Sequence, residues 1–479
     1  MPIQLYYLPT MKLQFCGAAR QVTGSSHLVI LDNGYKILLD CGLFQGSYSE
    51  DLVANSQFLF DPKEINCLVL SHAHMDHAGR LPKLVKDGFR GKIHSTHATR
   101  SLCAIMLLDG AFIQEKDAEF FNKKHANKRD PSLSVIQEPL YTTKDVDETM
   151  KLFLGYPYDQ WHHICSGVRV MYTDPGHILG SASVSLEIEE NGKKIFLGFT
   201  GDIGRPNRPI LRDPQSMPPC DYLICESTYG DKKHESLPNE LERFLDIIKH
   251  TCIVKKGKLI IPAFSIGRTQ EIVYLLDQAH TAHQLPPIKV YVDSPLAVNA
   301  TTVYGSHPEC FDNDLNKYLL TDKNPFGFND LIYIRDVEQS KALNTSKEPC
   351  IIISASGMMN AGRVKHHLAN NIEDTKNTIL IVGYCSPETP GGILRSGATG
   401  LKLFGEYKQV KADIEIMDSF SAHGDRDEMS DFISNQKPGL KKLFLVHGEY
   451  DTQQSWRSYL TEKGFQDIEI PAKGEIVEL

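Results

Sequence analysis

Six residues, HAHMDH at positions 72–77, constrain this chain more than any other segment, because they bring four potential metal ligands into one short loop. The loop follows the apolar, strand-like run NCLVLS at 66–71 and precedes the helix-like run GRLPKLVKD at 79–87, so its ends are held rigidly. In an extended chain His72 and His74 point the same way, while Asp76 and His77 face elsewhere. Zinc accepts both imidazole nitrogen and carboxylate oxygen. The segment therefore predicts a site for one or two metal ions rather than a His-rich surface turn.

The composition is that of an ordinary globular protein with room for two or three domains in 479 residues. No run of about twenty apolar residues is present, so a membrane span is not expected. The eleven cysteines are scattered without a CxxC pair, and the first ten residues lack a secretory signal. These features predict reduced thiols and a cytoplasmic location. The net charge of -9 excludes a protein that coats nucleic acid through bulk positive charge, but it does not exclude a nucleic-acid enzyme.

The order of apolar runs predicts one β-rich domain interrupted by an α/β domain. Strands are expected near 11–17, 27–32, 35–42 and 66–71, a helical segment at 98–125, and further strands at 168–174, 181–190 and 193–202. From about residue 220 nearly continuous apolar runs alternate with helical segments: 221–227, 258–264, 288–294, 350–356 and 378–384. That pattern is typical of a doubly wound parallel sheet. After residue 410 strand-like runs occur again at 412–419 and 442–449, and we expect them to complete the first domain.

Acidic and imidazole side chains recur at the ends of the predicted strands, each close to a glycine. They are Asp40, His177, Asp202, His423 and His447. Taken singly, each has an ordinary structural explanation. Small neighbours nevertheless let the backbone turn sharply and bring a side chain into a crowded site. A centre with two metal ions needs about three or four protein ligands per ion and one bridging group, and these residues supply the number that the HAHMDH loop lacks.

These motifs resemble those of a known family. HAHMDH is similar to the HxHxDH signature of the metallo-β-lactamase superfamily, and Glu226 in ICESTYG, His423 in FSAHGD and His447 in VHGE resemble three further motifs of its β-CASP nucleases. That family includes ribonuclease J and the endonuclease of eukaryotic pre-mRNA 3′-end cleavage. The resemblance implies an α/β fold: a metallo-β-lactamase αββα sandwich, formed by residues 1–212 and 409–479, with an inserted β-CASP domain at 213–408 built on a mainly parallel sheet flanked by helices.

The resemblance also implies two Zn²⁺ ions per chain and a role for each candidate residue. His72, His74 and His177 would hold one ion, Asp76, His77 and His447 the other, and Asp202 would bridge them. A hydroxide shared by the ions would attack phosphorus, so Asp76 counts among the catalytic residues. Asp40 would orient the loop through hydrogen bonds. His423 would be the general acid, with Glu226 orienting it and raising its protonated fraction.

Substrate binding is expected in the inserted domain. The segment ASGMMNAGR at 355–363 resembles the Ser-Gly-Met loop of the family, and its Ser356, Gly357 and Met358 precede a helix whose N-H groups suit phosphate. Arg268 in SIGRTQE and Arg363 are further candidates, and both segments can equally be plain structural junctions. The segment GYCSPETPGGIL at 383–394 departs from the Thr-Leu-Gly-Arg stretch common in the family. The chain ends predict the minimal, single-subunit bacterial form.

The resemblance implies a zinc-dependent ribonuclease that acts on single-stranded RNA, with no membrane association, and leaves a 5′-phosphate and a 3′-hydroxyl. A DNA-directed nuclease of the same family is the alternative. A non-catalytic RNA-binding partner subunit is disfavoured because all seven expected metal ligands are present. Hydrolysis of small esters is disfavoured, because it would give the large insertion and His423 no function. The residues do not separate endonuclease from 5′-to-3′ exonuclease activity, and they leave the oligomeric state open, with a homodimer as one expectation.

Overall fold

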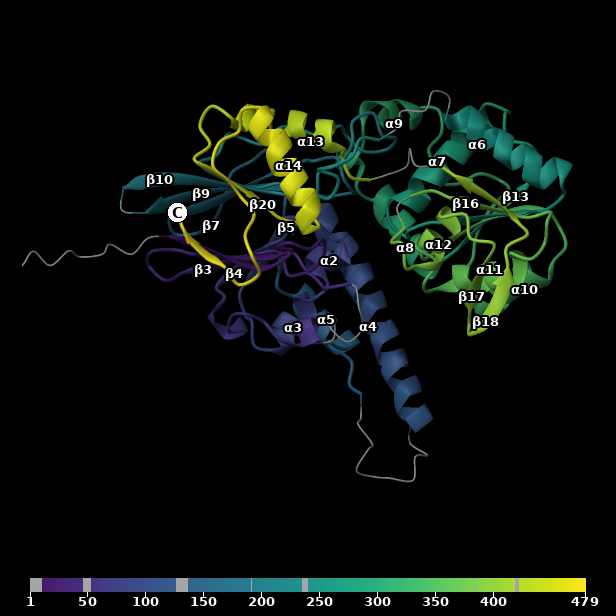
Figure 1. The fold of residues 1–479 in the computed structure, drawn as a ribbon, viewed down its shortest axis with the longest axis horizontal. Coiled ribbons are helices and arrows are strands. Elements are labelled where there is room, and N and C mark those ends of the chain that lie inside the picture. The colour runs from purple at the N-terminus through teal and green to yellow at the C-terminus, as the bar shows by residue number, and fades with distance from the viewer. Residues whose placement is uncertain are drawn as a thin grey trace, which may run out of the picture. The chain divides into compact units, whose positions relative to one another are not determined.

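The computed structural model describes residues 11–45, 53–125, 137–190, 192–234, 240–383, 385–417 and 422–479. The chain divides into two compact units (Figure 1). The sandwich unit comprises Met1–Pro206, Asp213–Lys233 and His423–Leu479, and the inserted unit comprises Asn207–Arg212 and His234–Ala422. The domain boundaries expected after residues 212 and 408 stay a prediction. The division into compact units differs from them, because it places residues 213–233 with the sandwich and residues 409–422 with the insertion.

The sandwich unit contains two seven-stranded sheets. The first has the order β22-β1-β2-β3-β4-β5-β6, with β1 Lys12–Gly17, β2 Ser26–Ile30, β3 Lys36–Leu39, β4 Cys67–Val69, β5 Lys92–Thr96, β6 Phe153–Tyr156 and β22 Ile476–Glu478. The second has the order β21-β20-β11-β10-β9-β8-β7, with β7 His162–Cys165, β8 Val168–Thr173, β9 Ser183–Glu190, β10 Lys193–Phe199, β11 Tyr222–Cys225, β20 Lys442–Leu445 and β21 Ile468–Glu469. The strands expected before residue 75 and between 168 and 202 are therefore all present.

The two sheets pack face to face around a shared apolar core, to which β1 to β4 contribute from one side and β8 to β11 and β20 from the other. On the outer face of the second sheet, Met429 and Phe432 of α13 (Arg426–Phe432) and Trp456 of α14 (Tyr450–Glu462) form a second core. Helices α3 (Leu81–Lys86), α4 (His97–His125) and α5 (Thr143–Met150) cover the first sheet (Figure 1). The predicted αββα sandwich is confirmed.

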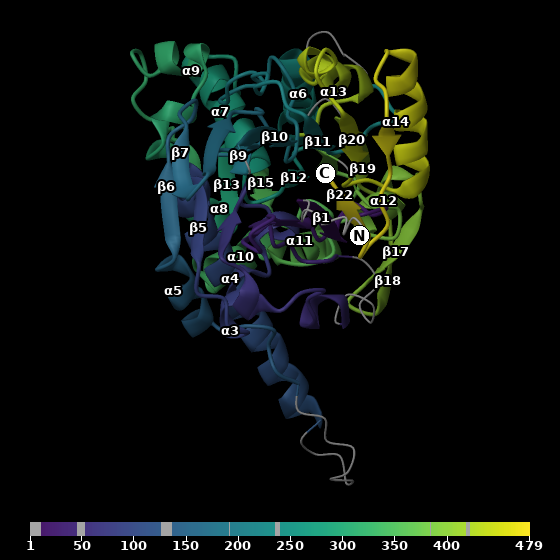
Figure 2. The ribbon, with the colours of Figure 1, turned by 90° about the vertical axis from the view of Figure 1, so that its left-hand side faces the viewer.

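Helix α4 extends well beyond the strands that it covers, as Figures 1 and 2 both show. Its first part contacts β5 and β6, while its continuation leaves Phe112 and Phe120 largely exposed. Although α4 has 29 residues, charged side chains interrupt it. Among the described residues, none of the helices is long and apolar enough to cross a membrane.

The inserted unit is built on a six-stranded sheet in which every neighbouring pair is parallel. Its order is β14-β13-β15-β12-β16-β19, with β12 Lys258–Pro262, β13 Lys289–Asp293, β14 Leu331–Tyr333, β15 Cys350–Ser354, β16 Thr378–Ile381 and β19 Asp413–Ile416. A separate hairpin pairs β17 (Gly400–Leu403) with β18 (Glu406–Gln409). The helices are α6 Glu240–Ile248, α7 Arg268–Thr281, α8 Pro295–Gly305, α9 Asn313–Tyr318, α10 Val337–Thr345, α11 Arg363–Asn371 and α12 Pro390–Arg395. The predicted parallel sheet flanked by helices is confirmed.

Two strands lie in a different sheet from the one that the sequence predicted. Strand β11 was expected in the inserted sheet, but it lies between β10 and β20 of the sandwich. Strand β19 was expected to return to the sandwich, but it pairs with β16 of the inserted sheet. Both expectations are wrong for the same reason: the two sheets contain adjacent parallel strands, and an apolar run does not specify which parallel neighbour it joins.

One buried side chain makes the stability of the sandwich depend on pH. His27 of β2 is fully buried between the rings of Phe15 and Phe199, with centroids 5.6 and 5.5 Å away, and neither ring nitrogen has a hydrogen-bond partner among the described residues. Burial lowers the pKa of His27 from 6.5 to about 3. Below pH 6.5 the unfolded chain therefore binds a proton at this side chain, whereas the folded chain binds it only near pH 3. The free energy of unfolding consequently falls as the pH is lowered from 6.5 toward 3.

We expect His27→Leu to remove this part of the acid sensitivity. Between pH 7 and pH 5 the wild type should lose about 2 kcal/mol more unfolding free energy than the variant. Urea denaturation at both pH values measures the difference. His163→Leu, at an exposed position of β7, is the matched control and should behave like the wild type. Equal pH dependence of His27→Leu and wild type would contradict the prediction.

Candidate metal centre

The candidate ligands follow the carboxyl ends of strands that point toward one edge of each sheet of the sandwich unit. Asp40 follows β3, and the HAHMDH loop follows the parallel neighbour β4. In the second sheet β8, β10, β11 and β20 run in one direction, because β9 is antiparallel to both β8 and β10, while β11 is parallel to both β10 and β20. His177, Asp202, Glu226 and His447 follow these four strands in turn. Residues up to 407 positions apart in the chain thus reach one site.

A first set of ligand atoms combines the two leading histidines of the loop with His177. Nδ1 of His74 lies 3.2 Å from Nε2 of His72 and 3.2 Å from Nε2 of His177. Oδ2 of Asp202 lies 3.4 Å from the same Nε2 atoms of His72 and His177. A single atom from each of the four residues therefore falls within 4.8 Å of every other.

A second set lies on the other side of the Asp202 carboxylate. Nε2 of His447 is 3.1 Å from Nε2 of His77 and 3.4 Å from Oδ2 of Asp76. Oδ1 of Asp202 is 3.2 Å from Nε2 of His77 and 3.7 Å from Nε2 of His447. Each oxygen of Asp202 thus faces one of the two sets.

The arrangement fits two metal ions by a geometric test. An ion with tetrahedral ligand bonds of about 2.0–2.2 Å separates its ligand atoms by roughly 3.4 Å, and most of the distances within each set lie close to that value. In addition, Oδ1 of Asp202 is buried and receives no hydrogen bond from the described residues. A buried carboxylate oxygen without a donor is costly unless a cation satisfies it.

Asp40 lies behind the second set and fixes His77. Its fully buried carboxylate accepts Nδ1-H of His77 at 2.7 Å, which leaves Nε2 of that ring toward the ligand atoms. The backbone N-H and the hydroxyl of Ser71 donate to Asp40 at 2.8 Å each, and the hydroxyl of Ser25 donates at 3.1 Å. Sequence reasoning singled out neither serine, and the only signal is the position of Ser71, which directly precedes the HAHMDH loop.

The backbone around these residues leaves no room for larger side chains. A Cβ atom on Gly42 would lie 1.6 Å from the carbonyl oxygen of Asp76, and one on Gly204 would lie 1.9 Å from that of Gly176. Asp40 and His447 themselves adopt positive φ angles of 59° and 54°. The glycines beside the candidate ligands therefore permit the close approach of loops that the site requires.

His423 and Glu226 lie next to the first set. Nδ1 of His423 is 3.3 Å from Oε1 of Glu226, and Nε2 of His423 is 3.9 Å from Oδ2 of Asp202. Oε1 of Glu226 also accepts the N-H of Ile203, and Oε2 accepts that of Thr228. Glu226, Asp202 and His447 form a third group with metal-ligand spacing. Both carboxylate oxygens of Glu226, however, already accept hydrogen bonds from the backbone.

The pKa values of the histidines in the first set shift in the opposite direction from that of His77 in the second set. Burial lowers the pKa of His72 and His177, and it lowers the pKa of His74 to about 3, so these imidazoles are neutral near pH 7 and offer their lone pairs to a metal. Burial also opposes a charge on His77, but the carboxylates of Asp202 and Asp40 raise its pKa well above the ordinary value.

The same competition holds at His423. Burial opposes its charged form, but the carboxylates of Glu226 and then Asp202 raise the pKa of His423 to about 9. The ring is thus predominantly protonated at neutral pH. A cationic imidazole beside a carboxylate-rich centre is a suitable proton donor.

Thr228 holds the ring of His447, and its replacement tests the second set. Its hydroxyl lies 3.0 Å from Nδ1 of His447, so the opposite nitrogen of that ring points toward Asp76 and His77. We expect Thr228→Val to weaken binding of one metal ion by about 10- to 100-fold, because lost outer hydrogen bonds typically cost that much. Thr228→Ser keeps the hydroxyl and should bind like the wild type. Competition with a zinc chelator measures both, and equal affinities for the two variants would contradict the assignment.

The residues expected to bind substrate lie in the inserted unit, and both arginines are paired with carboxylates. Arg268, the first residue of α7, pairs with Glu271. Arg363, the first residue of α11, donates to Asp293 at 2.6 Å and to the carbonyl of Arg335 at 2.7 Å. The role of these arginines in binding RNA stays a prediction.

The Ser356 to Met358 loop is held by the segments around it. The hydroxyl of Ser356 donates to Asn360 at 2.9 Å, and the carbonyl of Met358 accepts the N-H of Gly391. A Cβ on Gly357 would lie 2.9 Å from the ring of Phe264, so the loop packs closely there. Binding of phosphate by this loop also stays a prediction.

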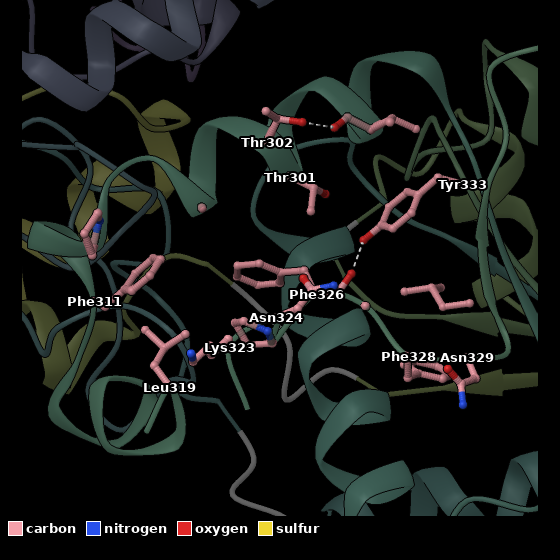
Figure 3. A pocket seen from close by; sticks show the side chains of 16 residues that line it. Thr301, Thr302, Phe311, Leu319, Lys323, Asn324, Phe326, Phe328, Asn329 and Tyr333 are labelled. Atoms are coloured by element: carbon pink, nitrogen blue, oxygen red, sulfur yellow. Dashed lines mark hydrogen bonds between the residues drawn. The ribbon is translucent and has the colours of Figure 1, made fainter. Parts of the chain in front are cut away.

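The inserted unit also contains a cavity of about 690 Å³, but its chemistry differs from that of the metal centre. Figure 3 shows its lining, which includes Phe311, Phe326, Phe328 and Tyr333 with Lys323 at the rim. The hydroxyl of Tyr333 donates to the carbonyl of Phe326 at 2.7 Å. No His, Cys, Asp or Glu is among the lining residues. The cavity therefore lacks the His, Cys and carboxylate side chains that a metal site needs.

Comparison with known proteins finds the same arrangement of domains. Residues 19–147 match the metallo-beta-lactamase superfamily, residues 269–394 the Beta-Casp domain, and residues 407–471 the Zn-dependent metallo-hydrolase RNA specificity domain. Ribonuclease TTHA0252 of Thermus thermophilus is 33% identical over 465 residues, which cover 97% of this chain and 99% of that protein.

Longer relatives match over part of their length. Transcription termination factor FttA of Methanosarcina mazei is 28% identical over 90% of this chain and 66% of its own. Cleavage and polyadenylation specificity factor 73 of Drosophila melanogaster is 30% identical over 92% of this chain and 60% of its own. A crystal structure of a protein of unknown function from Enterococcus faecalis shares the fold, with a TM-score of 0.54 and 12% identity over 98% of this chain and all of that one.

An αββα sandwich with candidate metal-binding side chains gathered at its strand ends defines a metal-dependent hydrolase of the metallo-β-lactamase superfamily. Within that superfamily, the chain belongs to the β-CASP family of nucleases.

Proposed function

We propose that this protein is a zinc-dependent ribonuclease that hydrolyses phosphodiester bonds of single-stranded RNA and leaves a 5′-phosphate and a 3′-hydroxyl. The observation that carries the proposal is the Asp202 carboxylate, whose two oxygens face two separate sets of ligand atoms, with His423 beside it. Support for RNA comes from the match to an RNA specificity domain and from a full-length relative named as a ribonuclease.

In this proposal the first zinc ion is held by His72, His74 and His177, and the second by Asp76, His77 and His447. Asp202 joins the two sets, and Asp40 holds His77 in the tautomer that presents Nε2. When bound, two such ions supply an activated water and positive charge for the developing phosphorane-like transition state. The protein's own contribution is to fix these ligands before substrate arrives.

The leaving 3′-oxygen requires a proton, and His423 is the group placed to donate it. Its Nδ1 faces Glu226, so Nε2, on the side of Asp202, is the nitrogen that would transfer the proton. Glu226 acts as a positioning residue, because its carboxylate is anchored by the N-H groups of Ile203 and Thr228. This division of roles resembles a general acid oriented by a carboxylate.

The experiment compares single-stranded RNA and DNA of one sequence, labelled at either end, in the presence of zinc. The proposal predicts cleavage of RNA well above that of DNA, with 3′-hydroxyl products. Faster cleavage of DNA, or products ending in a 3′-phosphate, would overturn it. RNAs with 5′-hydroxyl, monophosphate and triphosphate ends, run in parallel, separate internal cleavage from 5′-to-3′ degradation through their product ladders. A homodimer and a cytoplasmic location stay predictions.

A further inference from the structure

The hairpin β17–β18 and the neighbouring helix α11 carry an exposed aromatic and basic surface in the inserted unit. We call it the hairpin patch and define it by Lys365, His366, Lys402, Phe404 and Tyr407. The side chains of Phe404 and Tyr407 are 54% and 66% exposed. Large aromatic side chains at this exposure, beside positive charge, suit a ligand with flat faces and negative groups.

Phe404 lies at the turn of the hairpin and packs against His366. Its ring centroid lies 4.6 Å from that of His366 with a 31° interplanar angle, and Nζ of Lys365 lies 4.9 Å from the ring. The preceding Leu401 and Leu403 are buried in the core of the inserted unit. The hairpin is thus anchored by its leucines, while the exposed Phe404 ring has the tilted ring of His366 beside it.

Tyr407 forms a second platform on the outer face of the hairpin. It pairs across the strands with Lys402, on the face opposite the buried leucines. A Cβ atom on Gly400 would lie 2.1 Å from the hydroxyl oxygen of Tyr407, so the tyrosine ring lies across the space that this glycine leaves. The hydroxyl end of the ring therefore contacts the hairpin, while most of the side chain is exposed to solvent.

The charge of the surrounding segments is positive, although the chain as a whole carries -9. Residues 363–371 and 400–411 contain five basic side chains and one acidic side chain: Arg363, Lys365, Lys402, Lys408 and Lys411 against Glu406. Arg363 and Lys408 are engaged in ion pairs, with Asp293 and with Glu373 and Glu406. Lys365 and Lys402 thus remain as the cations next to the two aromatic rings.

We propose that the hairpin patch binds unpaired bases of single-stranded RNA, which stack on Phe404 and Tyr407 while Lys365 and Lys402 contact the adjacent phosphates. The proposal rests on the proposed ribonuclease function and specifies a second place where its substrate is held. Stacking on aromatic side chains beside basic groups is a general way to bind single strands without sequence preference. The lysines beside the rings favour this occupant over a protein partner, because lysine is depleted in protein–protein interfaces relative to the rest of the surface.

The test uses the full-length zinc-loaded protein with Phe404→Ala, Phe404→Leu and Phe404→Trp, and two substrates. For a 20-nucleotide single-stranded RNA we expect KM to rise about ten-fold or more with alanine and with leucine, to stay near wild type with tryptophan, and kcat to stay within about two-fold. Hydrolysis of bis(p-nitrophenyl) phosphate, which has no base and reports only on the metal centre, should be unchanged. Phe120→Ala, at another exposed phenylalanine on α4, is the matched control and should leave KM unchanged.

Two results overturn the inference while leaving the ribonuclease function in place. One is an unchanged KM for RNA in the alanine and leucine variants. The other is a loss with alanine that leucine restores, because that pattern indicates an apolar protein-type contact rather than base stacking. Failure of the proposed function looks different, since the wild type itself would then hydrolyse bis(p-nitrophenyl) phosphate without cutting RNA. Lys365→Ala adds an independent check, because it should lower the slope of log KM against log salt by about 0.7.

Discussion

Asp202→Asn is expected to lower RNA cleavage by at least about 1000-fold and to reduce the metal content below two ions per chain. The asparagine side chain has no charge, and only one of its two terminal atoms accepts a metal, so it cannot serve both sets of ligand atoms. The loss corresponds to about 4 kcal/mol of transition-state stabilisation. Steady-state cleavage of labelled RNA, together with metal analysis of the purified protein, measures both effects.

Asp147→Asn, at an exposed position of α5, is the matched control for the loss of one carboxylate and should keep full activity and metal content. The assignment of Asp202 as the bridge would be contradicted by an Asp202→Asn protein that retains two ions and cleaves RNA within ten-fold of wild type.

His423→Ala should separate proton donation from metal binding. We expect two metal ions to remain, because His423 belongs to neither set of ligand atoms, and RNA cleavage to fall by about 10²- to 10⁴-fold, the usual contribution of a general acid. Bis(p-nitrophenyl) phosphate has a leaving group that needs no proton. Its hydrolysis by the variant should therefore fall far less than the cleavage of RNA.

The comparison of the two substrates excludes a merely structural role for His423. An equal loss on both substrates, or the loss of a metal ion, would show that His423 supports the centre rather than donating a proton. Glu226→Gln provides the matched positioning variant. It should reduce RNA cleavage with the same substrate dependence, because it weakens the hold on Nδ1 of His423 without removing the ring.

The candidate site was predictable from the sequence because its residues follow strands. Parallel strands bring their carboxyl ends to one edge of a sheet, which gathers Asp202 and His447 in the second sheet and Asp40 with the HAHMDH loop in the first. The packing of the two sheets then brings both groups into one site. Ser25 and Thr228 were not predictable, because the role of a hydroxyl group depends on the atom that it contacts in the folded chain.

The fold was predictable as a set of layers, but not the membership of every strand. Strands β11 and β19 both lie beside parallel neighbours, and an apolar run has the same appearance in either sheet. Similarly, the sequence showed that Arg268 and Arg363 begin helices, but not that each is paired with a carboxylate. The partner of an arginine depends on side-chain packing, which the spacing of apolar residues does not contain.

The most direct test of the proposed two-metal ribonuclease is a titration of the metal-free protein with zinc, followed by cleavage of a labelled single-stranded RNA. If both sets of ligand atoms are needed, activity should rise to a plateau with a break at two equivalents of zinc per chain, and Asp202→Asn should show no such rise. A break at one equivalent, or no RNA cleavage at any zinc concentration, would contradict the account.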